Sequence, residues 1–147
     1  MPADVDLVKL LDKYLGGTGT GTSTGAPSEK AGVDLFEGGF HETPENQLTV
    51  VHFDGEPPER SMGPSLSKPD LENVLVLVMA RNVSLATART RAKAFHVLLD
   101  NRHDYTSTGG TLYHLIESQD GPPRLIEQDS NMRWVVGASY RVKKAAE

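Results

Sequence analysis

Two segments of the chain repeat their apolar residues at intervals of three and four, the spacing of an α-helix that buries one face. The first segment, residues 4–15, ends at a Gly-Gly pair that favours a helix C-terminus. The second begins after Ser84, a good N-cap residue, and continues to Asn101. Its apolar positions are Leu85, Ala88, Ala92, Phe95 and Leu99. The polar side chains expected to point away from the core are Arg89, Arg91, Lys93 and His96.

Alternating or continuous apolar runs predict the strands. Residues 74–80 (VLVLVMA) are apolar on both faces, which indicates a central strand covered by helices on at least one side. The other predicted strands are 33–40, 47–53, 111–118, 125–126 and 133–142. Turn residues predict loops at 54–70 and 101–110. The order of elements predicts one α+β domain over 1–147, a mixed, mostly antiparallel sheet packed by two helices, with long loops.

Residues 16–32 (GGTGTGTSTGAPSEKAG) have almost no apolar content, and we expect a mobile loop within the domain. Glycine-rich loops hold phosphates in two common motifs, but neither spacing is present. The P-loop ends in GK[ST], a tripeptide that this segment lacks, and G-x-G-x-x-G fails at Thr22. The segment also follows a helix, whereas both motifs follow a strand. No nucleotide cofactor is therefore expected.

The charge of the chain disfavours direct binding of DNA or RNA. The 147 residues carry a formal net charge of −5, and the basic residues cluster only at Arg141, Lys143 and Lys144. A protein that grips nucleic acid usually presents a basic face to the phosphates. The chain has no cysteine, which excludes disulfides and thiol catalysis. No apolar run approaches the roughly 20 residues of a membrane helix, so we expect a soluble protein made inside the cell, with no membrane partner.

The junction between the central strand and the second helix has the order in which some hydrolases present a nucleophilic serine. That motif is G-x-S-x-G, and the sequence here is ARNVSLA, so Ser84 is predicted to be a helix cap. Arg81 ends the strand and has two possible roles. It binds an anion together with the helix N-terminus, or it pairs with a carboxylate in its own fold or at a subunit contact. The absence of a nucleophile, a base or a phosphate loop around it favours the second role.

No pattern of histidines or acids predicts a catalytic or metal site. The histidines form neither H-x-x-x-H nor H-E-x-x-H, and two nearby ligands such as His52 and Asp54 do not make a metal site. Carboxylate pairs such as Asp4 and Asp6 lie among polar residues, where nothing is expected to raise a pKa for acid–base work. We therefore predict no enzyme, no metal and no cofactor.

Two further tracts are candidates for contacts. Asp129 and Arg133 flank the turn before the last predicted strand, and they are expected to cap and pair that turn. The loop FDGEPPERSMG carries several prolines, mixed charges and a methionine, so it is stiff enough to serve as a docking surface. The candidate interface residues are Glu59, Arg60, Met62, Arg81, Asp129 and Arg133.

The layout resembles the tail terminator proteins of long-tailed bacteriophages, also described as minor capsid or tail completion proteins. The similar pieces are DLVKLLDKYL, NQLTVVHFDGEPPE, NVLVLVMARNVS, LATARTRAKAFHVLLD and LIEQDSNMRWVVGASYRV. The family commonly has an arginine after the central strand, alanines inside the next helix and a D-x-x-x-R element before the last strand. The residues at those places are Arg81, Ala88, Ala92, Asp129 and Arg133. The leucine-glycine pair usual before the aspartate is absent, because Leu125 is followed by Ile126.

The resemblance implies a structural virion protein without catalysis. Such a protein forms a ring, usually six-fold, on the head-proximal end of the tail tube, where it ends tube polymerisation. Its expected partners are copies of itself, the tail tube protein and the head–tail connector or stopper protein, while DNA only passes through the lumen. The expected location is the tail or neck of the virion, after assembly in the bacterial cytoplasm.

Three other classes remain as alternatives. Another neck ring protein, such as a head–tail stopper or a tail completion factor, shares the same small fold. A small enzyme would need a pocket with convergent polar groups, and a nucleic-acid-binding module would need a basic face. Formation of a ring, tight binding of a small ligand and salt-sensitive binding of DNA would respectively distinguish the ring proteins, the enzyme and the nucleic-acid module.

Overall fold

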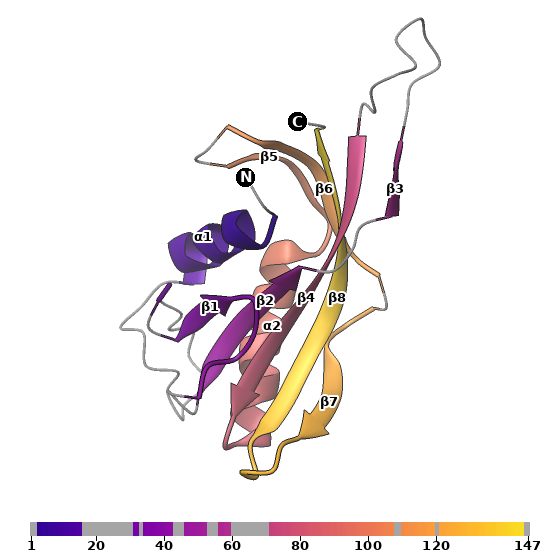
Figure 1. Ribbon diagram of the computed structural model, residues 1–147. Helices are drawn as coiled ribbons and strands as arrows, with labels where there is room; N and C mark the ends of the chain where they lie inside the picture. Colours follow the sequence, from indigo (N-terminus) through magenta and orange to yellow (C-terminus); the bar gives the residue numbers. More distant parts are fainter. Residues whose placement is uncertain are drawn as a thin grey trace, which may run out of the picture.

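The computed structural model describes residues 3–15, 31–32, 34–42, 46–52, 56–59, 71–107, 110–119 and 121–145. These residues form two helices and eight strands in one sheet (Figure 1). The helices are α1 (Ala3–Leu15) and α2 (Leu85–Leu99). The strands are β1 (Leu35–Glu37), β2 (Gln47–His52), β3 (Glu56–Glu59), β4 (Leu71–Asn82), β5 (Arg102–Thr106), β6 (Leu112–Ser118), β7 (Arg124–Gln128) and β8 (Trp134–Ala145).

Two long antiparallel strands, β4 and β8, form the centre of the sheet. Each has 12 residues, and they pair along their whole length, from Leu71 opposite Ala145 to Asn82 opposite Trp134. At one end β2 flanks β4 and β7 flanks β8, while at the other end the flanking strands are β3 and β6. Strand β1 adds to β2 in parallel, and β5 adds to β6. The predicted α+β class, with a mixed and mostly antiparallel sheet, is confirmed.

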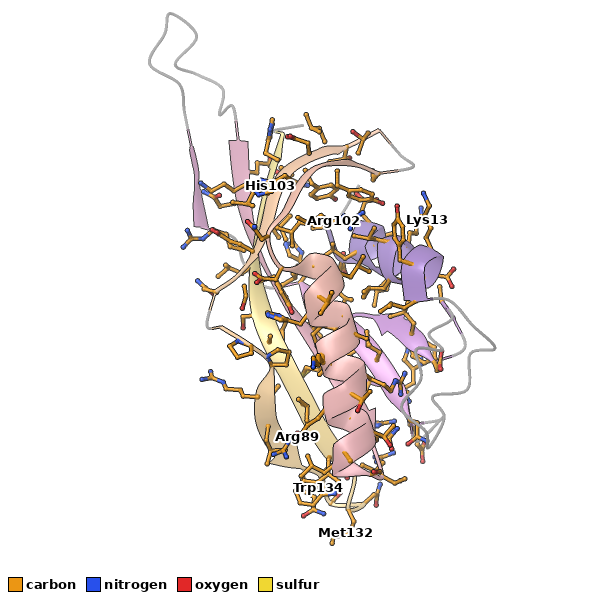
Figure 2. The ribbon with its side chains drawn as sticks, turned by 180° about the vertical axis from the view of Figure 1, so that it is seen from behind. Lys13, Arg89, Arg102, His103, Met132 and Trp134 are labelled. Carbon is orange, nitrogen blue, oxygen red and sulfur yellow. The ribbon has the colours of Figure 1, made fainter. Side chains whose placement is uncertain are left out.

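Both helices cover the same face of this sheet (Figures 1 and 2). The covered face follows from strand alternation, since side chains two apart point the same way. Val76, Val78 and Ala80 of β4 lie opposite Tyr140, Ala138 and Val136 of β8, and all six are buried. From α2, Phe95 is fully buried and its ring meets that of Tyr140 edge-on, with 6.4 Å between centroids. The apolar stripe predicted for the second helix is thus the core stripe.

The structure corrects two predicted loops. Part of 54–70 is the strand β3, and part of 101–110 is the strand β5. Both form because a neighbouring strand supplies hydrogen bonds, with Glu56 opposite Asn73 and Tyr105 opposite Tyr113. Strand β3 contains Pro57 and Pro58, and proline is tolerated in a strand where its missing N–H is not needed for pairing, as at the edge of a sheet.

The orientation predicted for Arg91 was also wrong. Its side chain is fully buried, and its Nη2 lies 3.9 Å from the Oδ2 of Asp34, which is equally buried. Arg91 falls four residues before Phe95, so it shares the inward face of α2. A buried charge at this place requires a partner, and Asp34 supplies the opposite charge.

Most of the predicted mobile loop, namely 16–30, lies outside the described residues. Its last two residues contact the sheet and α1, because Gly32 N donates to the Leu35 carbonyl at 3.0 Å and Ala31 N donates to Asp12 Oδ1 at 3.5 Å. Neither α1 nor α2 is long and apolar enough to cross a membrane.

Candidate functional site

Arg81 holds the connection between β1 and β2 in place within its own fold. It ends the pairing of β2 with β4, opposite Gln47, and only 4% of its surface is exposed. Its Nη2 donates to the His41 carbonyl at 2.7 Å, and its guanidinium lies 4.8 Å from the centre of the Phe40 ring. The Gln47 amide holds the same residue from the other side, because it accepts from His41 N at 2.8 Å and donates to His41 O at 2.6 Å. These contacts lie within its own subunit.

The predicted role of Ser84 as the cap of the second helix is confirmed. Ser84 Oγ accepts a hydrogen bond from Thr87 N at 3.4 Å, which satisfies one of the amides left free at the start of α2. The Asn82 carboxamide accepts from Ser84 N at 2.9 Å and fixes the turn from the strand side. The serine hydroxyl is therefore engaged with the helix.

Asp129 and Arg133 cap and pair the turn before β8, as predicted. Asp129 Oδ2 accepts from Arg133 Nε at 2.7 Å, and its Oδ1 accepts from the amides of Arg133 at 2.9 Å and Asn131 at 3.0 Å. Partial burial acts to raise the pKa of Asp129, but these hydrogen bonds outweigh it and hold the pKa below its ordinary value. Met132, at the turn, has a positive φ of 62° and is 67% exposed.

Arg133 also reaches the segment that Arg81 holds. Its Nη1 donates to the Glu42 carbonyl at 3.4 Å, one residue beyond the carbonyl bound by Arg81. Two arginines from β4 and from the turn before β8 thus pin one connection between β1 and β2. The predicted positions of both arginines, after the central strand and before the last strand, were correct. The sequence did not indicate that both bind residues 41 and 42, because these residues are distant from both arginines along the chain.

The other candidate interface residues do not join this group. Glu59 lies in β3, opposite Leu71 at the far end of β4 from Arg81. Arg60 and Met62 lie outside the described residues. Among the described candidates, Glu59 therefore lies apart from Arg81.

The face of the sheet opposite the helices carries a row of partly exposed aliphatic side chains. On β4 these alternate with the core residues, and Val51 of β2 lies opposite one of them, Leu77. The row is Val51, Leu75, Leu77 and Met79. On β8 the same face has Gly137, and a Cβ there would lie 2.6 Å from the Val78 carbonyl oxygen. We call this surface the helix-free face.

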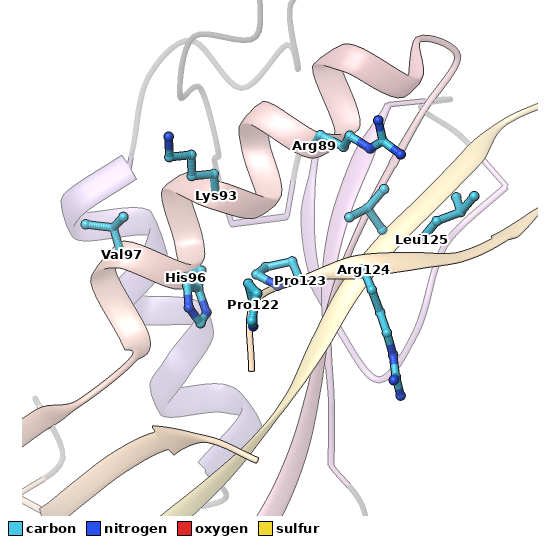
Figure 3. A pocket seen from close by; sticks show the side chains of 9 residues that line it. Arg89, Lys93, His96, Val97, Pro122, Pro123, Arg124 and Leu125 are labelled. Atoms are coloured by element: carbon cyan, nitrogen blue, oxygen red, sulfur yellow. The ribbon is translucent and has the colours of Figure 1, made fainter. Parts of the chain in front are cut away.

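A groove that sequence reasoning missed lies between α2 and β7 (Figure 3). It measures about 550 Å³. It is lined by Arg89, Lys93, His96, Val97, Pro122, Pro123, Arg124, Leu125 and Val136. Arg89 and Lys93 project from the exposed side of the helix, whereas the side chain of Arg124 turns away from α2 (Figure 3). We call this feature the α2–β7 groove.

His96 is the group in this groove that most resembles a catalytic one. Its Nδ1 lies 2.8 Å from the Tyr140 hydroxyl and its Nε2 lies 3.7 Å from Asp100 Oδ2. Burial, and then the Asp100 charge, raise the pKa of Tyr140 far above its ordinary value, so the hydroxyl stays protonated. Tyr140 is fully buried and cannot meet a substrate. The arrangement ties α2 to β8, and among the described residues no group of three His, Asp or Glu could hold a metal ion.

A second polar cluster fixes α1 to the β5–β6 hairpin. The buried carboxylate of Asp6 accepts a hydrogen bond from the Tyr113 hydroxyl. Arg102, which is labelled in Figure 2, lies over the rings of Tyr14 and Tyr105, 5.1 and 5.4 Å from their centres. Burial and the Asp6 charge raise the pKa of Tyr105. These contacts hold elements together rather than open a site.

Comparison with known proteins adds the fold alone. No family model matches the chain, and no curated protein matches it. Among the solved structures that match, one aligns over 99% of both chains with a TM-score of 0.53 and 11% identity. At that identity the likeness indicates a shared fold over the full length, and it says nothing of function.

Proposed function

We propose that this chain is a structural subunit that assembles into a ring and caps the head-proximal end of a phage tail tube, where it joins the tail to the head connector. The helix-free face is the observation that supports self-assembly. A two-layer α+β subunit with helices on one side leaves the other side of its sheet uncovered. Aliphatic side chains in a row on such a side are typical of a surface that another protein covers.

A ring requires every copy to use the same two different surfaces, so that each contact points onward to the next copy. The helix-free face serves as one of these surfaces, with Val51, Leu77 and Met79 at its centre. The resemblance in sequence layout supports the tail location. The α+β fold and the clamped connection at His41 and Glu42 are compatible with a rigid building block. Another neck ring protein would use the same contact, so it remains the alternative.

The contact is tested first in purified protein. Leu77→Asp places a charge in the centre of the helix-free face, and we expect it to abolish the ring seen by native mass spectrometry and negative-stain microscopy. Val83→Asp is the matched control, because Val83 is 51% exposed at the turn before α2. It should leave assembly intact. Where Leu77→Asp does not fold, Val51→Asp tests the neighbouring strand.

The location is tested in the phage. Particles made without this chain should have tails that are overlong or separate from filled heads. Tails of normal length joined to filled heads would reject the tail terminator proposal. A wild-type protein that stays monomeric at all concentrations, and also in the presence of tail tubes, would reject the ring.

A further inference from the structure

We infer that the edge of β7 together with the α2–β7 groove binds a short, extended, acidic and apolar segment of a different protein. The inference does not require ring formation, because the groove lies on the helix side of the sheet and the rest of the site is the edge of β7. It rests on three properties of this edge: the exposed side chains of β7, the cations that surround it, and the open hydrogen-bonding side of the strand.

Strand β7 exposes two consecutive large aliphatic residues, one on each face of the sheet. Leu125 is 43% exposed and lines the groove beside Val136. Ile126 is 44% exposed and reaches the other face, where its Cδ1 would lie 3.0 Å from a Cβ at Gly137. Val97 of α2, 74% exposed, faces the same groove. Adjacent exposed apolar residues on an edge strand are unusual unless a partner covers them.

Cations border the edge on both faces, although the whole chain is acidic with a net charge of −5. Arg89 and Lys93 stand on the helix side, and Arg124 turns to the other side (Figure 3). The described residues that line the groove include no carboxylate, although Asp100 lies beside His96 and Glu127 is on β7 itself. Charge complementarity therefore favours a partner segment that carries carboxylates.

The outer side of β7 offers main-chain hydrogen bonds. Among the described residues only β8 pairs with β7, and all five residues of β7 are exposed. A peptide that adds as a strand gains main-chain hydrogen bonds, while its side chains contact residues on both faces of the sheet. Pro122 and Pro123 precede β7, and the register shifts between Leu125 and Glu127. These two features shorten the regular edge, so the added strand must be short.

A second copy of this chain is a poorer occupant. Outside the edge, the exposed large apolar residues among the described part are Tyr14, Val83 and Met132. Tyr14 lies beside Lys13 and Arg102, which are both cations. Val83 neighbours the Asn46 amide, and the carboxylate next to Met132 is already bonded to Arg133. None of the three combines an apolar side chain with an available cluster of acids.

The test uses a capped synthetic peptide of about seven residues, the length of a short strand. Its order is glutamate, leucine, leucine, glutamate, glutamate, leucine, leucine, so that both faces of the extended chain carry both residue types. We expect saturable binding to the folded protein by fluorescence anisotropy, together with slowed amide exchange in β7. The same peptide with lysine in place of glutamate should not bind, and N-methylation of alternate amides should abolish binding.

Variants locate the site. The double variant Arg89→Glu, Lys93→Glu should weaken binding of the glutamate peptide by about tenfold or more, since two attractive charges become repulsive. Leu125→Asp should weaken it similarly. The matched control is Lys9→Glu, Lys13→Glu on α1, which makes the same change of net charge at two exposed positions and should alter binding by less than about twofold.

Three outcomes overturn the inference. They are no binding of the glutamate peptide, equal binding of the glutamate and lysine peptides, and equal weakening by the groove and control variants. Loss of the ring in the groove variants, with peptide binding unchanged, would assign the edge to a second copy and also reject the inference. Failure of the ring proposal has a different signature, because Val51→Asp, on β2 and away from β7, should leave peptide binding unchanged.

Discussion

Asp129 holds Arg133 through both oxygens of its carboxylate. Oδ2 accepts from the guanidinium at 2.7 Å, and Oδ1 accepts from the backbone amide of the same residue at 2.9 Å. The pair closes the turn before β8 and leaves Arg133 Nη1 directed at the Glu42 carbonyl. A local pairing within four residues thereby positions a contact to a segment that lies 91 residues earlier in the chain.

The contribution of Asp129 to the stability of the fold should decrease as the pH falls. Its pKa in the folded protein is held below the ordinary value of 3.8, so the ionised form stabilises the fold. This contribution is complete above the unfolded pKa and disappears as the pH falls through the folded pKa. Asp129→Asn should therefore lower the free energy of unfolding at neutral pH and make little difference in strong acid. Urea denaturation at a series of pH values checks this, and a difference that persists unchanged in acid would contradict it.

Phe95→Ala should destabilise the protein by about 3–5 kcal/mol, because it empties a fully buried site in a packed core. Val97→Ala, two residues along on the exposed side of α2, should cost less than about 0.5 kcal/mol. Both are measured by urea denaturation. An unchanged midpoint for Phe95→Ala would mean that α2 does not pack on the sheet as described.

Arg81→Met should cost about 1.5–3 kcal/mol, the range for a hydrogen bond made by a charged group, and it leaves the His41 carbonyl with one donor fewer. Arg81→Glu should cost more, since it buries a negative charge beside that carbonyl. The control substitution is Arg89→Met, at an arginine that is exposed on α2. If Arg81→Met unfolds at the wild-type urea concentration but fails to assemble, the arginine serves a subunit contact and the intramolecular clamp is unimportant.

Gly137→Ala tests the close approach of β8 to β4. The added Cβ would lie 2.6 Å from the Val78 carbonyl oxygen and 2.9 Å from Met79 Cγ, and the backbone atom cannot move without breaking the strand pairing. We expect a loss of about 1–3 kcal/mol from overpacking. Ser139→Ala, on the same face two residues away, should change stability by less than about 1 kcal/mol. Equal effects of the two substitutions would show that the sheet relaxes freely here.

Local chemistry made several features readable from the sequence. The cap joins the Ser84 side chain to an amide three residues later, and the turn before β8 is closed by Asp129 and Arg133, which are four residues apart. The buried stripe through Phe95 depends on helical spacing alone. The apolar run at 74–80 could only be a central strand, and β4 contains it. Such features are predictable because the residues involved lie close together along the chain.

The two helices, the central strands, the α+β class and the caps can be read from the sequence, because each is set by periodicity or by neighbours along the chain. The tertiary structure decided the strands β3 and β5, the burial of Arg91 against Asp34 and the target of Arg81. It also decided that Leu125 and Val97 border one groove. In each case the partner comes from a distant part of the chain, and the free energy of a pairing, an ion pair or a buried hydrogen bond exists only after folding brings both members together.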